Sequence, residues 1–425
     1  MNKLIEKSEG IRGEISVPGD KSISIRSVIF GSIAEGDTII THLGTGGDIQ
    51  SAVRCLKQLG VSFEEKNDSI IIHGKGLYGL SKPSTVIDVG NSGTTIRLLT
   101  GVLAGQKFES TITGDNSIQS RPMKRITNPL KLMGAEIKGE RDDNCAPLII
   151  VGKKLTAIKY VSPIASAQVK SSIMLASLYA EGITQILEPY KSRDHSERMM
   201  AYMGGNVTVD GNNISIEGGQ KLKGREIFVP GDISSAAFFI AGALIVDNSE
   251  ILLKDIGVNP TRTGIIDVLK RMGANIFIQN IREINNEPVA DILVKSSELK
   301  GIEISGETIP RVIDEIPILS VVAALSEGET IIKDAGELRV KETDRIKAVV
   351  TNLKRLGADI KELSDGMNIN GPSKLKGAEL ESFGDHRIAL AFTVAGLNAD
   401  GNTVIKDAEW ADISFPGFFS MLNNF

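Results

Sequence analysis

One short run of residues occurs twice in this chain, and that repeat limits the possible folds more than any other feature. The run Val-Pro-Gly-Asp-Lys-Ser at residues 17–22 returns as Val-Pro-Gly-Asp-Ile-Ser at residues 229–234, 212 residues later. Because the chain has 425 residues, the two copies stand about half its length apart. Self-similarity at a fixed spacing indicates a duplicated structural unit. The sequence therefore predicts two similar halves.

Each half divides again, into three repeats. Six strongly apolar segments of helical length recur at intervals of 68 to 80 residues, and short β-rich runs follow most of them. The segments begin near Ser22, Ser92, Ser166, Ser234, Asp314 and Asp385. A helix that is apolar on every side is a buried helix. The expected architecture is three helices buried inside a shell of sheets and further helices, formed twice, and a one-layer solenoid is the disfavoured alternative.

A second, amphipathic helix pattern follows in five of the six repeats, and the sixth repeat ends without one. Each pattern closes on a Leu-Gly or Met-Gly step. The glycines are Gly60, Gly134, Gly204, Gly273 and Gly357. Glycine in this place predicts a left-handed residue at the helix C-terminus.

Charge and cysteine usage exclude several classes of function. The formal net charge of −5 argues against broad nucleic-acid binding, which needs a basic face. Cys55 is expected in the core and Cys145 in a loop, without a CxxC pair, and the four histidines lack a metal-ligand spacing. No apolar run reaches the roughly 18 residues that span a bilayer, and the first residues lack a signal core. A cytoplasmic protein without a metal site is expected.

Polar residues gather at the starts of the six apolar segments. Helix capping explains many of the Ser, Asp and Asn side chains there, and it is the simpler interpretation of Ser22, Ser234 or Asp385 taken alone. Cations are different, because they oppose the positive end of the helix dipole. Lys21, Arg26 and Arg387 therefore indicate bound anions. The sequence predicts a site for a ligand with several negative charges.

Further cations stand before the amphipathic helices. Arg121 precedes a proline that is expected to open a helix, and Ser192-Arg193 occupies a similar place in the third repeat. Lys341 and Arg345 are like-charged at i,i+4, which is unfavourable on a helix face unless an anion is present. A solvated helix start is the alternative for that run.

Four runs, in order along the chain, resemble the signatures of the EPSP synthase family, the 3-phosphoshikimate 1-carboxyvinyltransferases. They are residues 18–26, 90–97, 339–345 and 383–387. The resemblance implies a two-domain, inside-out α/β barrel of six βαβαββ repeats, with buried parallel helices whose N-termini face an interdomain cleft that closes on substrate. The implied domains are residues 21–233, and residues 1–20 with 234–425.

The resemblance also implies a reaction. The carboxyvinyl group of phosphoenolpyruvate moves to the 5-hydroxyl of shikimate 3-phosphate by addition and elimination, on the way to chorismate and the aromatic amino acids. Asp314 is implied as the base for the hydroxyl proton, and Glu342 and Lys21 as the groups that exchange a proton with C3. No metal or cofactor is implied, and the protein is expected to be a monomer without nucleic-acid or membrane partners.

The implied substrate contacts follow position by position from the family. Those for shikimate 3-phosphate are Lys21, Ser22, Arg26, Ser166, Gln168, Ser192, Arg193, Asp314 and Lys341. Those for phosphoenolpyruvate are Lys21, Asn91, Gly93, Arg121, Gln168, Arg345 and Arg387. Each ligand carries two anionic groups, and arginine suits both phosphate and carboxylate.

The sequence departs from the commonest family pattern in four places. These are Leu98, Ala167, His195 and Ile413, and together they resemble a divergent bacterial branch of which some members tolerate glyphosate. Gly93 keeps the small residue linked to sensitivity, so tolerance is left open. Ile413 stands where other members carry a lysine, which leaves open what completes the phosphoenolpyruvate site.

Two other functions stay in view. The sister transferase that acts on UDP-N-acetylglucosamine carries a cysteine in a loop of its second repeat, and residues 114–122 contain none. A non-catalytic anion-binding relative is the other alternative. The presence of Lys21, Asp314 and Glu342 argues against it.

Overall fold

The computed structural model describes residues 1–424, which form two compact units. Unit 1 comprises Met1–Pro18, Pro230–Glu283 and the chain from Pro288 onward, and unit 2 comprises Gly19–Val229 and Ile284–Glu287. The chain therefore passes between the units four times. The domain boundaries expected at residues 20 and 233 stay a prediction.

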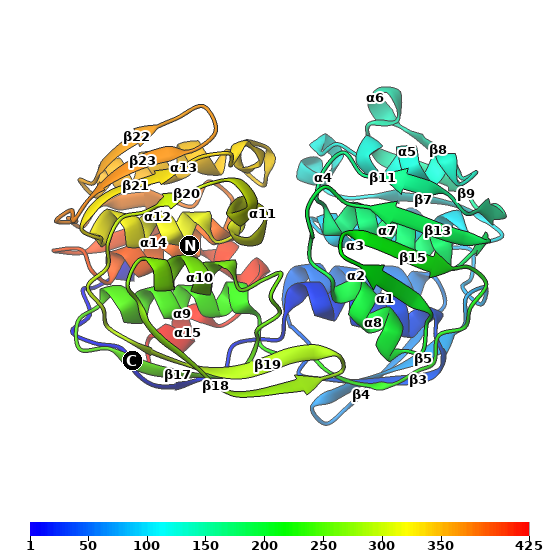
Figure 1. Cartoon of the computed structure of the whole chain (residues 1–425), viewed down its shortest axis with the longest axis horizontal. Helices are drawn as coiled ribbons and strands as arrows, with labels where there is room; N and C mark the ends of the chain where they lie inside the picture. Colours follow the sequence, from blue (N-terminus) through cyan, green and yellow to red (C-terminus); the bar gives the residue numbers. More distant parts are fainter. Residues whose placement is uncertain (425) are drawn as a thin grey trace. The chain divides into compact units, whose positions relative to one another are not determined.

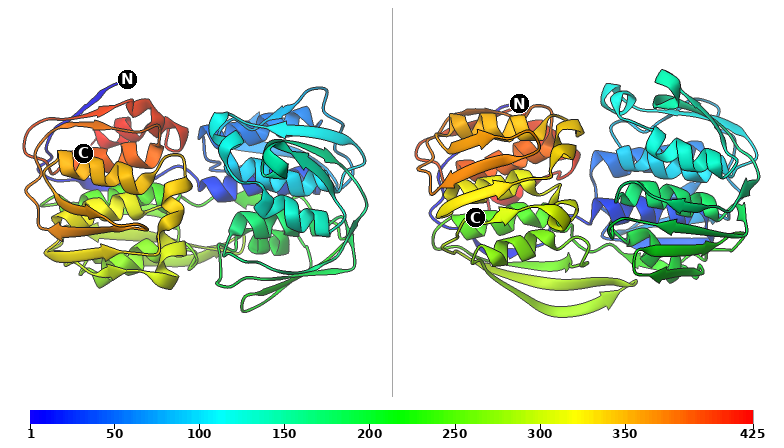
Figure 2. Two further views of the ribbon diagram at one scale, coloured as in Figure 1. Left: turned by 90° about the horizontal axis from the view of Figure 1, so that it is seen from above. Right: turned by 45° about the horizontal axis from the view of Figure 1, so that its top comes forward.

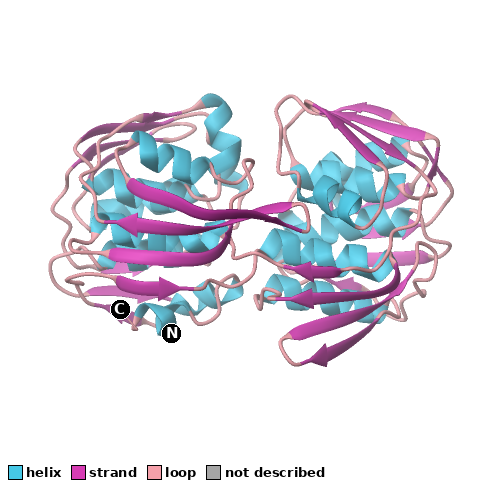
Figure 3. Cartoon of the chain, turned by 60° about the horizontal axis from the view of Figure 1, so that its bottom comes forward, coloured by secondary structure: helices cyan, strands magenta, loops and turns pink. Residues whose placement is uncertain are grey.

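Three buried helices form the centre of each unit, and they are the six apolar segments of the sequence. In unit 2 they are α1 (Lys21–Ile33), α3 (Gly93–Ala104) and α7 (Ala167–Ser177). In unit 1 they are α9 (Ile233–Ile245), α12 (Ile316–Leu325) and α14 (His386–Gly396). Strands lie on the outside of each unit and helices within, as Figures 1, 2 and 3 show. The predicted buried helices are confirmed.

One βαβαββ repeat shows how the sheets arise. Strands β6 (Ile87–Asp88) and β7 (Glu109–Thr113) pair in parallel, joined through α3. Helix α5 (Lys124–Leu132) then leads to β8 (Glu136–Gly139) and β9 (Cys145–Val151), which pair antiparallel. Parallel strands need such a crossover, and a helix supplies it. The sheet order is β6-β7-β9-β8.

The same strand order recurs in the four other four-stranded sheets. Two of these sheets lie in unit 2. The strand order of the first is β16 (Glu226–Phe228), β3 (Glu35–Thr41), β5 (Ser69–Lys75), β4 (Ser62–Lys66). The strand order of the second is β11 (Lys159–Val161), β13 (Ile183–Leu187), β15 (Asn213–Glu217), β14 (Val207–Asp210). The other two sheets lie in unit 1. The strand order of the first is β2 (Arg12–Ile15), β17 (Glu250–Gly257), β19 (Glu287–Lys295), β18 (Asn275–Ile284). The strand order of the second is β20 (Glu303–Ile304), β21 (Gly328–Ile332), β23 (Met367–Gly371), β22 (Asp359–Glu362). In two of these sheets the first strand, β16 or β2, comes from a distant part of the chain.

The sixth repeat is completed by the beginning of the chain. Strands β24 (Glu379–Glu381) and β25 (Thr403–Lys406) pair in parallel around α14. Strand β1 (Lys3–Ile5) then adds antiparallel to β25, with Lys3 opposite Ile405. This gives a three-stranded sheet in place of a four-stranded one.

Five amphipathic helices lead to the antiparallel strand pairs. They are α2 (Gly47–Gln58), α5, α8 (His195–Tyr202), α10 (Gly264–Arg271) and α13 (Arg345–Arg355). One capping residue follows each, and then a glycine with left-handed φ. These are Gly60, Gly134, Gly204, Gly273 and Gly357, with φ of +85°, +94°, +86°, +100° and +87°. The predicted left-handed helix ends are confirmed.

Replacement of Gly357 by alanine tests the cost of that conformation alone. An added Cβ would meet no atom within 4 Å, so no clash contributes. We expect Gly357→Ala to lower the free energy of unfolding by about 1 kcal/mol, because a left-handed backbone strains an L-residue by roughly that amount. Gly357→Asn is expected to cost less, since asparagine tolerates this region. Urea unfolding measures both; equal losses for the two variants would contradict the explanation.

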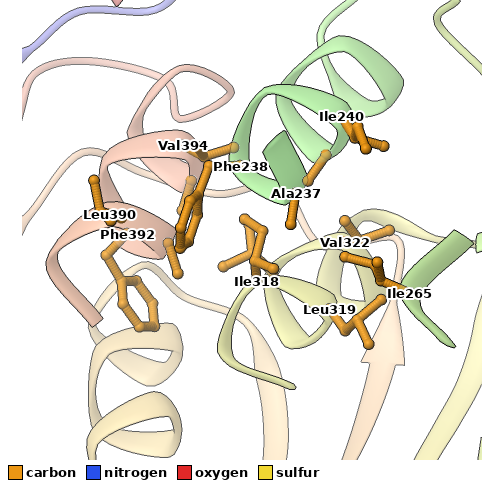
Figure 4. Packing of buried hydrophobic residues seen from close by; sticks show 14 of the residues in the cluster. Ala237, Phe238, Ile240, Ile265, Ile318, Leu319, Val322, Leu390, Phe392 and Val394 are labelled. Carbon is orange, nitrogen blue, oxygen red and sulfur yellow. The ribbon is translucent and has the colours of Figure 1, made fainter. Parts of the chain in front are cut away.

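The core of unit 1 shows how the buried helices pack. Figure 4 places Phe238 of α9, Ile318 of α12 and Val394 of α14 among the side chains where these helices meet. Phe239 of α9 also lies against Phe418 of α15 (Phe418–Leu422), with ring centroids 5.4 Å apart. Each buried side chain of this size contributes about 1.5–3 kcal/mol. This packing fixes the helix starts, where the polar residues lie.

The two cysteines are both buried. Cys55 lies in α2, as expected. Cys145 is the first residue of strand β9 and not part of a loop, because its segment pairs with β8. Among residues 1–424, no helix combines the length and apolar character needed to cross a membrane.

Candidate active site

The starts of the buried helices in unit 2 adjoin one another. Arg97 of α3 donates a hydrogen bond to Oε1 of Gln168, in the first turn of α7. The Nε2 atom of Gln168 donates to Oγ1 of Thr94 at 3.0 Å. Two helix N-termini are thereby tied together through one amide side chain. The first-turn N–H groups of these helices and the nearby cations favour an anion at this end of unit 2.

Capping accounts for only part of the polar residues at the helix starts. Asp20 caps α1 by accepting from the amide of Ile23 at 2.8 Å, so Ser22 is not the cap. Asp232 likewise caps α9 in place of Ser234. Asp385 does cap α14. The sequence interpretation was therefore right for Asp385 and wrong for the two serines, whose hydroxyls lie inside the first turn.

Arg26 is buried in a frame of oxygen atoms. Its guanidinium donates to Oγ of Ser196 at 2.7 Å, to Oγ of Ser171 at 2.9 Å and to the carbonyl of Ser22 at 3.0 Å. Burial lowers the pKa of Arg26 to about 10, and the carboxylate of Glu197 opposes that shift. Arg26 thus remains charged at neutral pH and is fixed in direction.

Lys21 lies one residue after the α1 cap. Its Nζ atom is 3.1 Å from Oδ2 of Asp48, in the first turn of α2. The lysine remains partly exposed, with 24% of its side chain accessible. Asp48 therefore holds a cation at the helix start that the helix dipole alone would repel.

The start of α3 is covered by Arg121. Its Nη2 atom donates to Oγ of Ser117 at 3.1 Å and to Oδ1 of Asn91 at 3.4 Å. A Cβ added to Gly93 would lie 3.0 Å from Nη1 of Arg121 and 3.3 Å from Nη1 of Arg97. Glycine is thus what allows two guanidinium groups to approach one helix start.

Pro122 does not open helix α5, contrary to the expectation. The helix begins at Lys124, and its capping residue Met123 gives no side-chain cap. The cap comes from Asn144 instead: its carbonyl accepts from the amide of Met123 at 2.7 Å, and its Oδ1 accepts from that of Lys124 at 3.4 Å. Arg121 is therefore anchored ahead of the helix.

Ser166, Ser192 and Arg193 lie near the starts of α7 and α8. Ser166 stands at the cap position of α7 but makes no capping bond through its side chain. The Oγ atom of Ser192 donates to Oε1 of Glu188 at 2.5 Å. Arg193 is half-buried in the same segment, two residues before α8 begins.

In unit 1, Arg345 is the centre of a buried cluster of charges. It donates to Oδ2 of Asp385 at 2.7 Å, to Oε2 of Glu342 at 2.6 Å and to Oδ1 of Asp314 at 3.4 Å. Burial by itself would lower the pKa of Arg345, but these carboxylates raise it above its ordinary value. The predicted anion requirement of Arg345 is met here by the protein's own carboxylates.

Asp314 lies within 4 Å of three cations. Besides Arg345, the Nζ atom of Lys341 is 3.9 Å from Oδ1, and Nη2 of Arg387 is 3.8 Å from Oδ2. Arg387 also donates to the Asp314 carbonyl at 2.9 Å. The carboxylate keeps 17% of its surface exposed, so it is held firmly and still accessible. Such a group can accept a proton from a bound ligand.

Lys341 and Arg345 do not share a helix face. Helix α13 begins at Arg345, and Lys341 precedes it in an extended conformation after a short 3-10 turn, Gly336–Val340. Lys341 pairs instead with Glu337 at 3.5 Å. The predicted i,i+4 repulsion is therefore absent, although both cations do face Asp314.

Sequence reasoning missed several residues that hold the expected ones in place. They are Asp48, Lys170, Glu188 and Glu197. Lys170 carried a usable signal, since it interrupts a segment that is otherwise apolar on every side. The acids carried none, because only the fold brings them to their partners.

His195 and His386 are both buried. His195 contacts Oε1 of Glu287 through Nδ1 at 2.8 Å, inside unit 2. His386 is the first residue of α14. Within residues 1–424, no group of three or more His, Cys, Asp or Glu side chains is arranged to hold a metal ion.

Known proteins match this chain over nearly its whole length. The EPSP synthase family (3-phosphoshikimate 1-carboxyvinyltransferase) matches residues 5–422. The 3-phosphoshikimate 1-carboxyvinyltransferase of Thermoanaerobacter sp. (strain X514) is 56% identical over 419 residues, covering 99% of each chain.

Solved structures agree as well. An EPSP synthase structure from Acinetobacter baumannii matches with a TM-score of 0.90 and 45% identity, covering 100% of this chain and 97% of that one. The enolpyruvyl transferase NikO from Streptomyces tendae matches with a TM-score of 0.80 at 14% identity, covering 99% and 96%, and shares the fold alone. With its six repeats around buried helices and this coverage by relatives, the chain belongs to the EPSP synthase family and has its two-domain, inside-out α/β fold.

Proposed function

We propose that this protein transfers the carboxyvinyl group of phosphoenolpyruvate to the 5-hydroxyl of shikimate 3-phosphate and releases phosphate. The observation that carries the proposal is Asp314, a partly exposed carboxylate within 4 Å of Lys341, Arg345 and Arg387. A base beside three cations suits a reaction that deprotonates a hydroxyl next to anionic ligands. Membership of the EPSP synthase family supports the same substrates. The cytoplasmic location and the monomeric state stay predictions.

Unit 2 supplies most of the proposed contacts to shikimate 3-phosphate. Arg26 is fixed by hydroxyls in a direction that suits the substrate carboxylate. The hydroxyl of Ser22 is not used as a helix cap, which leaves it for the substrate. Ser166, Ser192 and Arg193 are proposed to bind the phosphate, and Gln168 to lie along the ring. Asp314 and Lys341 complete the proposed set for this substrate.

The proposed phosphoenolpyruvate contacts are cations with fixed directions. Arg121 is held by Ser117 and Asn91 over the start of α3, where the Gly93 amide adds a donor. Arg345 and Arg387 are held by carboxylates that would share them with the incoming anion. Asn91, Gln168 and Lys21 complete the proposed set. A ligand with a phosphate and a carboxylate needs several such donors.

In the first half of the proposed reaction, the 5-hydroxyl oxygen bonds to C2 of phosphoenolpyruvate while Asp314 takes the hydroxyl proton. C3 gains a proton at the same time, from Lys21 or Glu342. In the second half, C3 loses a proton to that group, the C2–C3 double bond re-forms, and the bond from C2 to the phosphate oxygen breaks. The departing phosphate takes up the proton that Asp314 had accepted, which restores the carboxylate. Preorganised cations stabilise the departing phosphate.

Gly93→Ala tests the proposed phosphoenolpyruvate contact. The new Cβ would press on Nη1 of Arg121 at 3.0 Å, and only the flexible end of that side chain has to move. We expect the KM for phosphoenolpyruvate to rise several-fold and the KM for shikimate 3-phosphate to stay within about twofold, with the thermal midpoint nearly unchanged. Steady-state kinetics with each substrate varied in turn decides this. A larger change for shikimate 3-phosphate would assign Arg121 to the wrong ligand.

Phosphate release from phosphoenolpyruvate tests the function directly. The acceptors are shikimate 3-phosphate and, in parallel, UDP-N-acetylglucosamine, with EDTA present. Release only with shikimate 3-phosphate is the expected result. Release only with the sugar nucleotide would assign the sister activity, and release with neither acceptor would favour an anion-binding protein without turnover.

A further inference from the structure

A buried lysine and two glutamates lie beneath the Ser192 segment of unit 2. Lys170 stands in the first turns of α7, Glu188 directly follows β13, and Glu197 lies in α8. The Nζ atom of Lys170 is 2.7 Å from Oε2 of Glu188 and 2.8 Å from Oε1 of Glu197. The side chains of Lys170 and Glu188 are each 1% exposed. Three elements of the third repeat are thus joined by one ammonium group.

The cluster extends to Arg26, which interacts electrostatically with Glu197 and also with Asp20, Arg193 and Glu287. Burial alone would lower the pKa of Lys170, but Glu197 and Glu188 raise it above its ordinary value. A buried pair with both partners present is tolerated, whereas a lone buried charge is costly. Lys170, Glu188 and Glu197 therefore form a buried, paired platform inside the unit.

This platform holds every polar atom of Ser192. The carbonyl of Ser192 accepts from Nζ of Lys170 at 3.4 Å, and its amide donates to Oε2 of Glu188 at 3.4 Å. Its hydroxyl donates to Oε1 of Glu188 at 2.5 Å. The segment that leads into α8 is thereby fixed at Ser192 from below. Nothing in the proposed reaction requires Lys170 or Glu188 to touch a substrate.

We propose that Lys170 and Glu188 are positioning residues for the phosphate of shikimate 3-phosphate, acting through Ser192. This inference rests on the proposed function, which assigns Ser192 to that phosphate. A phosphate dianion can only accept hydrogen bonds, so the single Ser192 hydroxyl proton turns from Glu188 to the phosphate when the substrate binds. The two backbone contacts stay in place and keep the hydroxyl at the correct position. Preorganisation of this kind lowers the cost of ordering a segment on binding.

Binding of two ligands that differ only in the phosphate separates this role from a general loss of structure. The ligands are shikimate 3-phosphate and shikimate, and calorimetry gives the Kd of each. In the double variant Lys170→Met/Glu188→Met one charge of each sign is removed, so the net charge of the cluster does not change, and Glu197 keeps its electrostatic interaction with Arg26. We expect its Kd for shikimate 3-phosphate to rise at least tenfold and its Kd for shikimate to stay within twofold.

Two single variants of Glu188 keep the test decisive if the double variant does not fold. Glu188→Gln keeps the shape and an acceptor, and we expect its Kd for shikimate 3-phosphate to lie within threefold of that of the unaltered protein. Glu188→Asp keeps the charge but is one methylene too short to reach Ser192 and Lys170 together. We expect it to lower the preference for the phosphorylated ligand at least threefold.

Lys254→Met is the matched control. Lys254 pairs with the buried carboxylate of Asp291 at 3.0 Å in unit 1. Its replacement by methionine should leave both Kd values unchanged. Equal weakening of both ligands in the double variant or in Glu188→Asp, or no weakening of either ligand in those two variants, would overturn the inference. The phosphate-release assay on the unaltered protein is scored separately. Failure of turnover there rejects the proposed reaction, whereas the ratio of the two Kd values tests only the role of Lys170 and Glu188.

Discussion

Arg345→Met is expected to lower the free energy of unfolding by about 3–5 kcal/mol, the usual effect of removing one partner from a buried ion pair. The side chain of Arg345 is 2% exposed and that of Asp385 is fully buried, so their charges have little access to water. Without the guanidinium, Asp385, Glu342 and Asp314 would repel one another. Urea unfolding at neutral pH measures the loss, and carboxyvinyl transfer should fall below detection.

Two further variants separate the loss of charge from the loss of geometry. Arg355→Met removes a cation from the exposed side of the same helix, α13, where the contact to Glu381 is 3.6 Å, and should cost less than about 1 kcal/mol. Arg345→Lys keeps the charge but loses the fork that reaches two carboxylates, so it should restore part of the stability and little of the activity. If Arg345→Met lowered the free energy of unfolding by no more than Arg355→Met does, the Arg345 cluster would not be buried as described.

Asp314→Asn is expected to lower kcat by about 10²–10⁴-fold, the usual contribution of a general base. Asparagine keeps the shape and can still accept from Arg345, but it cannot take the hydroxyl proton. Binding of both substrates should change much less than kcat, because asparagine keeps a side-chain oxygen for the contact with shikimate 3-phosphate and loses only the ability to take the proton. Single-turnover phosphate release, together with calorimetric Kd values, gives the two quantities separately.

Asp359→Asn is the control for that change. Asp359 is exposed on strand β22, where its side chain accepts a hydrogen bond from Asn370 at 3.1 Å, so kcat should not change. If Asp314→Asn instead raised both KM values and left kcat intact, the carboxylate would be a binding group. The proton would then need another acceptor, with Glu342 as the remaining acid of the proposed set.

Local sequence determined much of the architecture. The apolar segments predicted buried helices because a helix such as α9, whose side chains are buried from Ile233 to Leu244, leaves no face for water. The glycines after the amphipathic helices predicted left-handed turns because other residues are strained there. Both features depend on a few neighbouring residues, and both were confirmed.

Local sequence could not predict the partners of the charged residues. Arg345 was predicted to need an anion, but its contact with Asp385 joins residues 40 positions apart and follows from the packing of α13 beside α14. The partners of Lys170 and Lys21 were missed for the same reason. Periodicity also placed Lys341 on a helix that in fact begins at Arg345. The proposed substrate roles of these residues stay predictions until the variants are measured.

The pairing of β1 with β25 affects the order in which parts of the chain can fold during translation. Lys3 lies opposite Ile405, so a strand synthesised at the start has to wait for one made near the end. At roughly 5–20 residues per second, translation separates the two by about 20–80 s. Strand β16, by contrast, pairs with β3 inside the continuous stretch Gly19–Val229, which can begin to fold as soon as it emerges. Unit 2 therefore has the earlier opportunity to fold, and the sheet that contains β1 is among the last parts of the molecule to form.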